Sequence, residues 1–518
     1  MKNLTYIVLL WMATVLASCF QDDSSLGTRE VGAIKIAELK DTSMISYSGK
    51  VLRISPKVEA GYPEAEMSYA WYIYGGSFEE KNDYRAYPIG EEKELAYEVN
   101  LPSGSYTVVF EATAGNSYAQ NTKFSLTVST PFSQGFYILK ETAEGNTELD
   151  LSTEDGLVEN LMESLLGESL KGKPIGLSVI YDNGYIDDRD LEMKADNMVH
   201  VFTEQDYRAF RTEDMYQTFS RDNLMFEPVP ADETFCAAIQ DPNGICFLSN
   251  KGFYRSNTGV SSGKLGVPDV EGGSKFIQSL GAGQAATVFW NEETHGLGEM
   301  TDGDWSERYE LPSGFDATNL ECLASGLNHS SAEEIGWFLC ADVNTGKRLL
   351  FMIKAEDPTG WGFYEVTEIT VNAVAADKHL ATGNVIGGNG LDASAIYVAD
   401  NSGIYLFDLA TQAETSFPLQ GIEGEIVYVS NNYLNINFLG TLSPDNFNYL
   451  LVGTQKGDQY NLYFYDNLVG GIPVKAPKQI IMGTGTVKGV RYLSTTLTSA
   501  DWQNILFMYT GPLYPFGD

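Results

Sequence analysis

From residue 132 onward the sequence repeats a short unit made of a strand, a turn and a second strand that ends in aromatic residues. The clearest copies run over 395–408 and 449–466, and related segments occupy 245–255. Units that return every few tens of residues are typical of a β-propeller, because each blade leaves a face that the next blade covers. About 385 residues, at roughly 40 to 55 per blade, allow seven or eight blades. We expect an all-β chain in which 131–518 form a β-propeller-like domain of about seven blades.

Two other folds compete for this region. Two stacked sandwiches or a β-solenoid would also contain many short strands separated by turns. One segment departs from the β pattern: residues 157–167 have apolar side chains at a spacing of about 3.6 residues. This spacing predicts a short helix near the first blade.

Residues 35–130 are predicted to form a small β-sandwich of immunoglobulin type. Tyr69-x-Trp71 lies in an alternating strand, a Pro-Ser-Gly turn at 102–104 leads through Tyr106 into a second strand, and a Val-rich strand closes the unit. In such domains a Trp in a middle strand helps to fill the core between two sheets. The segment resembles the PKD-like family found in lipoproteins of Bacteroidetes. We expect Trp71 and Tyr106 to be core residues.

The amino terminus carries a lipobox. Lys2 precedes a short apolar stretch, and residues 15–19 read Val-Leu-Ala-Ser-Cys. These are the parts of a secretory signal whose apolar stretch is too short to span a bilayer. We expect 1–18 to be the signal peptide, Cys19 to be the lipidated first residue of the mature chain, and 19–34 to be an anchor linker.

The residues after Cys19 refine the predicted location. Asp22 and Asp23 follow the anchor closely, and this acidic pair resembles the export signal that sends Bacteroidetes lipoproteins to the outer face of the outer membrane. Two incidental carboxylates in a solvated linker are the alternative. No second apolar run approaches the roughly 20 residues that a membrane helix needs. We expect a lipid-anchored protein of the outer membrane that faces the cell exterior.

The charge balance restricts the partners. Lys and Arg number 33 against 70 Asp and Glu, which gives a formal charge of -37. Such a field repels phosphate, so nucleic acid is excluded as an expected partner, and neutral or cationic ligands are favoured. Solubility alone also accounts for an acidic surface.

The remaining cysteines are Cys236, Cys246, Cys322 and Cys340. An even number in an exported chain permits two disulfides. A hairpin that turns at 241–244 would pair residue 239 with Cys246, which places Cys236 and Cys246 out of register for a bridge. The spacing contains no Cys-x-x-Cys, so a structural zinc site is not expected.

Catalytic motifs are weak throughout the chain. The four histidines lie apart, and none belongs to a His-Glu-x-x-His pair. A Gly-x-Ser-x-Gly match at 259–263 sits in a polar segment, and a glycine-rich match at 281–286 is followed by a predicted strand rather than a helix. The acidic run 187–190 could offer calcium ligands but does not match a full calcium loop, so a solvated turn is favoured. We expect no cofactor, no metal and no catalytic residue.

Aromatic side chains near polar groups are the predicted means of recognition. The candidates are Trp361, Trp305, Tyr364 and Trp502, with Trp361 preferred because it lies in a Gly-rich segment. Most tryptophans of a β protein simply fill the core.

The resemblance to the PKD-like lipoproteins implies a function. It implies a non-catalytic binding or docking accessory of a TonB-dependent uptake system, in which a channel and a lid lipoprotein import oligosaccharides or peptides. A cell-surface hydrolase of glycan or peptide is the alternative, and paired carboxylates at the propeller centre would favour it. An adhesin or surface scaffold is the third possibility.

Overall fold

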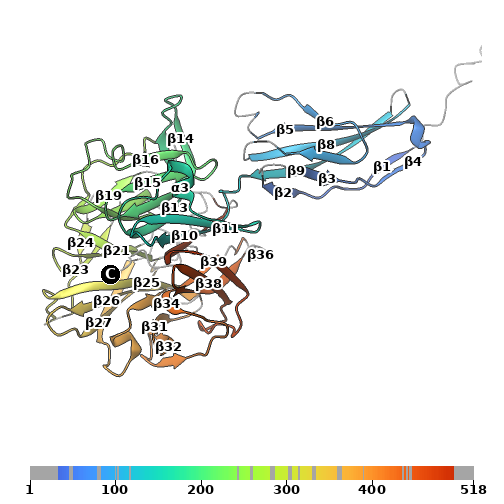
Figure 1. Cartoon of the computed structure of the whole chain (residues 1–518). Coiled ribbons are helices and arrows are strands. Elements are labelled where there is room, and N and C mark those ends of the chain that lie inside the picture. The colour runs from blue at the N-terminus through green and yellow to red at the C-terminus, as the bar shows by residue number, and fades with distance from the viewer. Residues whose placement is uncertain are drawn as a thin grey trace, which may run out of the picture. The chain divides into compact units, whose positions relative to one another are not determined.

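The protein is described by a computed structural model (Figure 1). It describes residues 33–45, 51–76, 78, 83–99, 101, 104–115, 118–241, 244–256, 261–280, 286–300, 306–312, 315–329, 334–356, 358, 365–388, 390–391, 393–434, 437–438, 441–442, 446–494 and 497. The chain divides into two compact units between Val128 and Ser129. Among these residues, no helix has the length and apolar character needed to cross a membrane.

The first unit is a β-sandwich. Its main sheet has the order β2 (Thr42–Ile45), β9 (Tyr118–Ser129), β8 (Gly104–Ala114), β5 (Met67–Gly75) and β6 (Tyr87–Gly90). Two pairs complete it: β1 (Ile34–Ile36) with β4 (Val58–Ala60), and β3 (Val51–Ile54) with β7 (Leu95–Glu98). A 3-10 turn, η2 (Glu64–Glu66), precedes β5.

Alternation along the strands fills the core of this sandwich. Trp71 and Tyr106 are 0% and 1% exposed, so the prediction that both are core residues is confirmed. The Trp71 ring lies 4.5 Å from that of Phe110, and its indole N–H donates to the Glu92 carbonyl at 2.9 Å. The buried indole therefore keeps a polar partner while its ring stays in the core.

The second unit is a β-propeller, and seven sheets of four or five strands are present among its described residues. In chain order, the second blade contains β13 (Pro174–Ile186), β14 (Met193–Thr203), β15 (Tyr207–Arg211) and β16 (Gln217–Ser220). The third contains β17 (Phe235–Asp241), β18 (Gly244–Ser249), β19 (Gly252–Ser256) and β20 (Val270–Glu271). The fourth contains β21 (Ser274–Leu280), β22 (Ala286–Asn291), β23 (Gly296–Met300) and β24 (Ser306–Arg308).

The next three blades follow the same antiparallel order. The fifth blade runs from β25 (Leu320–His329) through β26 (Glu334–Asp342) and β27 (Arg348–Glu356) to β28 (Glu365–Ala373), and a short strand, β30 (Gly390–Leu391), pairs in parallel with β25. The sixth blade contains β29 (Val385–Gly387), β31 (Ala395–Asp400), β32 (Gly403–Asp408) and β33 (Glu414–Ser416). The seventh contains β34 (Glu425–Leu434), β37 (Phe447–Lys456), β38 (Gln459–Asp466) and β39 (Gln479–Thr484). A hairpin of β35 (Asn437–Phe438) and β36 (Thr441–Leu442) and a 3-10 turn, η3 (His379–Ala381), lie between strands.

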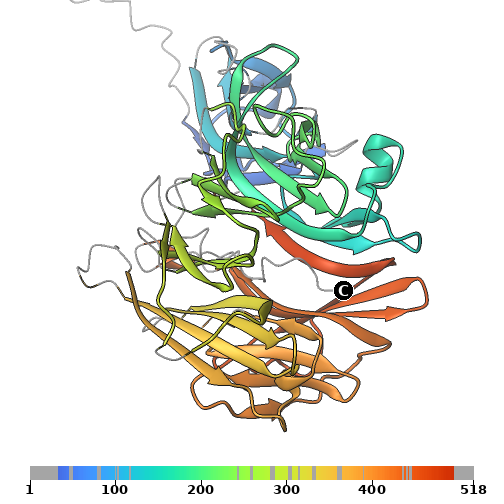
Figure 2. The same ribbon diagram turned by 90° about the vertical axis from the view of Figure 1, so that its left-hand side faces the viewer.

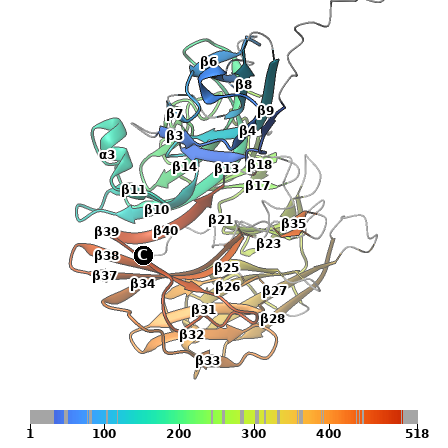
Figure 3. The ribbon, with the colours of Figure 1, turned by 90° about the vertical axis from the view of Figure 1, so that its right-hand side faces the viewer.

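The remaining blade joins the two ends of the propeller. Its order is β12 (Gly156–Val158), β11 (Thr147–Thr153), β10 (Gly135–Glu141) and β40 (Thr486–Leu493), so the last described strand is the inner strand of the first blade. Figure 2 and Figure 3 show the red β40 beside the teal β10. β40 also contacts β13 and β34, the inner strands of the neighbouring blades. This closes the ring, and the prediction of a propeller of about seven blades is confirmed.

Two local predictions can be compared with the structure. The helix α3 (Leu161–Leu166) occupies part of the predicted segment and ends at Gly167, whose φ of 84° suits a residue without a Cβ. In the β17–β18 hairpin Ile239 pairs with Cys246, so the predicted register is confirmed. No disulfide joins any of the four cysteines that the structure describes.

Candidate functional site

Five aromatic side chains gather where β37 begins and β40 ends. They are Phe136, Phe447, Tyr449, Phe464 and Tyr492, which we call the aromatic patch. Phe447 and Tyr449 are stacked with ring centroids 4.9 Å apart, and Phe447 meets Tyr492 edge-on, also at 4.9 Å. Phe464 is 1% exposed and forms the base, whereas the other four rings are partly exposed. The patch therefore offers ring surface to solvent on a packed base.

Strand geometry brings the patch together. Phe447 and Tyr449 are two residues apart on β37, so their side chains point to the same side of the sheet. Phe136 pairs with Tyr492 across β10 and β40, which places those two rings on one face of the first blade. The Phe136 ring lies 5.4 Å from that of Phe447 and thereby joins the rings of two adjacent blades.

Polar groups border the aromatic patch. Lys478 donates from Nζ to the Tyr449 hydroxyl at 2.9 Å, and the Nζ lies 3.4 Å from Asp466 Oδ1. The hydrogen bond to Tyr449 is the main cause that raises the pKa of Lys478, which remains a cation at neutral pH. On the other side Gln134 Nε2 donates to the Tyr492 hydroxyl at 3.2 Å.

This arrangement can bind a flat, partly apolar molecule that also carries hydroxyl groups. Tyrosine combines a large apolar ring with a hydroxyl that remains wet at the surface, so it contacts both parts of such a ligand. Lys478 and Gln134 add donors at the rim. None of these groups is a nucleophile with an adjacent base, so the patch suits binding rather than bond breaking.

If the protein were a hydrolase, we would expect paired carboxylates on the inner strands of the propeller, which line its centre. Among the inner-strand side chains that the structure describes, the fully buried polar ones are neutral except for Arg491: Ser178, Asn183, Gln240, Ser325, Asn328, Ser430, Asn431 and Asn432. They serve the fold, as when Gln240 bonds the backbone of Tyr181 through Oε1 and Nε2, each at 2.9 Å. A pair of buried carboxylates is absent from these described side chains.

A hollow of about 700 Å³ lies between the first and last blades. Its lining includes Lys140, Glu144, Glu148 and Asp458. Glu148 accepts the backbone N–H of Met162 and the Ser169 hydroxyl, at 3.0 and 2.7 Å, and so anchors α3. This carboxylate is therefore occupied by a structural role.

A buried ion pair stands in the wall of this hollow. Lys140 Nζ lies 2.7 Å from Asp150 Oδ1, and the two side chains are 1% and 0% exposed. Tyr460 donates to Asp150 Oδ2 at 2.8 Å. Burial raises the pKa of Asp150 above its usual range while Lys140 opposes the shift. Asp150 is not among the lining residues, so its perturbed carboxyl belongs to the ion pair rather than to a reactive site.

All five residues proposed from the sequence for lipidation or binding lie outside the described residues: Cys19, Trp305, Trp361, Tyr364 and Trp502. The aromatic patch was not predicted. Its residues lie in strands that the sequence marks as blade-forming, and core aromatics show the same alternation. The one available signal was the Phe-x-Tyr start of β37, which by itself does not separate a surface ring from a core ring.

The acidic run 187–190 is a salt-bridged turn. Hydrogen bonds from Arg189, with a further contribution from Lys194, hold the pKa of Asp187 well below its usual range. Lys194 Nζ also lies within hydrogen-bond distance of Asp190. These carboxylates are satisfied by cations of the protein, and the described residues contain no cluster suited to a metal ion.

The histidines are equally structural where their side chains are described. His200 is fully buried with Nδ1 2.8 Å from the Tyr207 hydroxyl, and burial lowers its pKa to about 3. His379 Nδ1 lies 2.7 Å from Asp400 Oδ2 and its ring stacks on Tyr405. His295 Nδ1 lies 2.8 Å from the Leu320 carbonyl oxygen.

These features define a β-sandwich followed by a seven-bladed propeller with an aromatic surface site. Residues 19–174 match the model of the PKD-like family, which confirms the resemblance inferred from the sequence for this part of the chain. The match extends past the first unit into the first blade of the propeller. No curated protein matches the chain.

Several solved structures are similar to the chain at low identity. A catalytically inactive virginiamycin B lyase from Staphylococcus aureus with quinupristin is 15% identical, with 62% of this chain and 92% of that chain covered and a TM-score of 0.34. A DUF4784 family protein from Bacteroides caccae is 11% identical, with 74% and 95% covered and a TM-score of 0.29. Bacteroides ovatus SGBP-B with a mixed-linkage heptasaccharide is 13% identical, with 58% and 74% covered and a TM-score of 0.15. At these scores the likenesses carry no functional conclusion.

Proposed function

We propose that this protein is a non-catalytic glycan-binding accessory of an outer-membrane nutrient-uptake system. Acyl chains on Cys19 would hold it at the outer face of the membrane, since two or more chains anchor stably where one binds marginally. The sandwich would act as a spacer, and the aromatic patch would contact the glycan. A TonB-dependent transporter and its lid lipoprotein would then take up the cargo.

The observation that carries the proposal is the aromatic patch. Four partly exposed rings at contact distance, bordered by Lys478 and Gln134, form a surface that a sugar chain can cover without bond chemistry. The formal charge of -37 favours a neutral polymer over an anionic one. The absence of a pair of buried carboxylates from the described inner-strand side chains weighs against the hydrolase alternative.

Affinity electrophoresis through gels that contain neutral polysaccharides tests the binding function. We expect at least one neutral glucan, xylan or mannan to retard the protein. Phe447→Ala and Tyr449→Ala should each weaken this binding about tenfold, because each variant loses one ring contact worth about 1.4 kcal/mol. Phe226, 66% exposed, supplies the control, because Phe226→Ala removes the same ring from an exposed position outside the aromatic patch. Retardation that persists unchanged in both patch variants would reject the aromatic patch as the contact.

Gentle detergent pull-down of a tagged copy from outer membranes tests the uptake role. A TonB-dependent transporter and a lid lipoprotein recovered in comparable amounts support it. Recovery of the protein alone favours an independent binder, and recovery with a foreign polymer but without a transporter favours an adhesin.

A further inference from the structure

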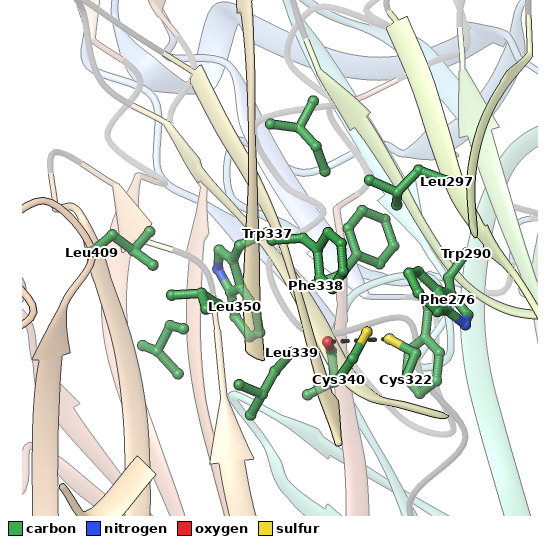
Figure 4. Close-up of a cluster of buried hydrophobic side chains, with 14 of the residues drawn as sticks. Phe276, Trp290, Leu297, Cys322, Trp337, Phe338, Leu339, Cys340, Leu350 and Leu409 are labelled. Atoms are coloured by element: carbon green, nitrogen blue, oxygen red, sulfur yellow. Dashed lines mark hydrogen bonds between the residues drawn. The ribbon is translucent and has the colours of Figure 1, made fainter. Parts of the chain in front are cut away.

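Cys322 and Cys340 lie directly opposite each other on neighbouring strands of the fifth blade. The two residues are register partners in the antiparallel strands β25 and β26, and they are 4% and 0% exposed. Figure 4 shows the two sulfur atoms pointing toward one another inside the cluster that contains Trp290 and Trp337. The Cys322 thiol donates to the Ala324 carbonyl at 3.6 Å, so it has a weak partner that it can release.

The backbone spacing at this pair fits a disulfide. Opposed residues of antiparallel strands have Cα atoms about 4.5 to 5.5 Å apart, and a disulfide needs about 4.4 to 6.8 Å. A bulge between Cys322 and Ala324 adds local freedom on the β25 side.

The other two cysteines supply the contrast. Cys246 pairs with Ile239, three residues away from Cys236 along β17. At about 3.3 Å per residue this offset places the two Cα atoms roughly 10 Å apart along the strand direction, beyond the limit of about 7 Å for a bridge. Geometry therefore selects one pair out of the four described cysteines.

We propose that Cys322 and Cys340 form a disulfide when the chain folds under oxidising conditions, while Cys236 and Cys246 remain thiols. The two cysteines lose two electrons and two protons as the S–S bond forms. A disulfide donor, either an oxidising thiol–disulfide exchange protein or oxidised glutathione, accepts them and is released as two thiols.

Burial sets the time at which this exchange takes place. Burial raises the pKa of the Cys322 thiol, and the attacking species in disulfide exchange is the thiolate. Neither sulfur is open to a donor once the blade has packed, so the bond forms during folding. The finished bond is protected from reductants for the same reason, and it ties the inner strand of the blade to the strand beside it.

Differential alkylation after oxidative refolding tests the proposal. The mature chain with Cys19→Ser is refolded in a glutathione redox buffer, denatured, blocked with iodoacetamide, then reduced and labelled with N-ethylmaleimide. We expect peptide mapping to find N-ethylmaleimide on Cys322 and Cys340 in most molecules and the first reagent on Cys236 and Cys246. Because the purified chain is used, this result does not depend on the location or the ligand of the protein.

Matched variants separate the bond from a general effect on folding. Cys246 and Cys340 are both 0% exposed, so Cys246→Ala and Cys340→Ala remove equal groups from equal burial. We expect Cys340→Ala to leave Cys322 open to the first reagent, and Cys246→Ala to keep the 322–340 bond. Refolding with a reductant present throughout should prevent the bond and lower the Tm of Cys246→Ala by a few degrees, as it should for the parent protein. The proposal is overturned if all four thiols react before reduction, or if the refolded protein contains a bridge that includes Cys236 or Cys246.

Discussion

Phe136 and Tyr492 face each other across the seam where the two ends of the propeller meet. They are paired residues of β10 and β40, and their ring centroids lie 4.8 Å apart. Phe136 also meets Phe464 edge-on at 4.9 Å, so it joins three strands of two blades. The contact that closes the ring is thus part of the surface that we propose for binding.

Phe136→Ala should lower the free energy of unfolding by about 2 kcal/mol, because a half-buried ring at the seam is lost. Tyr449→Phe, which removes only the hydroxyl bonded to Lys478, should change it by less than about 1 kcal/mol. Urea unfolding followed by intrinsic fluorescence measures both. Equal effects would mean that the seam does not depend on Phe136.

Substitutions of the buried Lys140–Asp150 pair should have non-additive effects on the free energy of unfolding. Lys140→Met leaves an uncompensated carboxylate at a side chain that is 0% exposed and should cost about 3 to 5 kcal/mol. Lys140→Met combined with Asp150→Leu should recover most of this loss, because no charge remains buried. Urea unfolding of Lys140→Met, Asp150→Leu and the double variant measures the three losses of unfolding free energy. A loss in the double variant equal to the sum of the two single losses would contradict the prediction.

Because His200 is buried in its neutral form, we expect the protein to lose folding stability in acid. Its pKa is about 3 in the folded protein against about 6.5 in an unfolded chain, so between these values the unfolded chain binds the extra proton. The contribution of neutral His200 to the free energy of unfolding is therefore fully present above about pH 6.5. It falls as the pH drops toward 3, by up to about 1.4 kcal/mol per pH unit. His200→Gln should flatten the dependence of the unfolding free energy between pH 6.5 and 5, whereas Phe226→Ala should keep the parent slope. Parallel slopes in all three proteins would exclude His200 as the source.

Cys19→Ser should release the protein from membranes, because the acceptor of the acyl chains is removed. Fractionation after carbonate washing measures the distribution. Treatment of intact cells with protease then tests the outer location of the parent protein, and protection in intact cells together with loss in lysed cells would contradict it.

Trp361→Ala should weaken binding to any polysaccharide that retards the parent protein. In the sequence Trp361 lies in a Gly-rich segment between β27 and β28, and an aromatic ring of this kind is a candidate platform for a sugar. Affinity electrophoresis with Phe226→Ala as control measures the change. Unchanged retardation would remove Trp361 from the ligand surface.

Local patterns in the sequence were sufficient to predict much of the fold. Alternating apolar residues between turns predicted the strands, and the Asp-Pro-Asn-Gly turn predicted the partner of Cys246 in the β17–β18 hairpin. Trp71 was recognised as a core residue because its neighbours alternate around it.

The same local patterns could not predict which strands pair when they lie far apart in the sequence. Nothing near residue 490 indicates that β40 completes a sheet with β10, since strands pair through backbone groups that all residues share. The aromatic patch was missed for this reason: Phe136, Phe447 and Tyr492 become neighbours only when the ring closes. Candidates chosen from single short segments of the sequence could not include a surface assembled from both ends of the propeller.

The position of β40 at the end of the propeller has a consequence for when the fold can be completed during synthesis. Its partner β10 is synthesised roughly 350 residues earlier, and pairing between such distant segments is slow because a long loop must close first. A chain that stops before Thr486 leaves the first blade without its inner strand, so the edge of β10 that pairs with β40 stays open. Closure of the propeller therefore requires a chain that has been translated through β40.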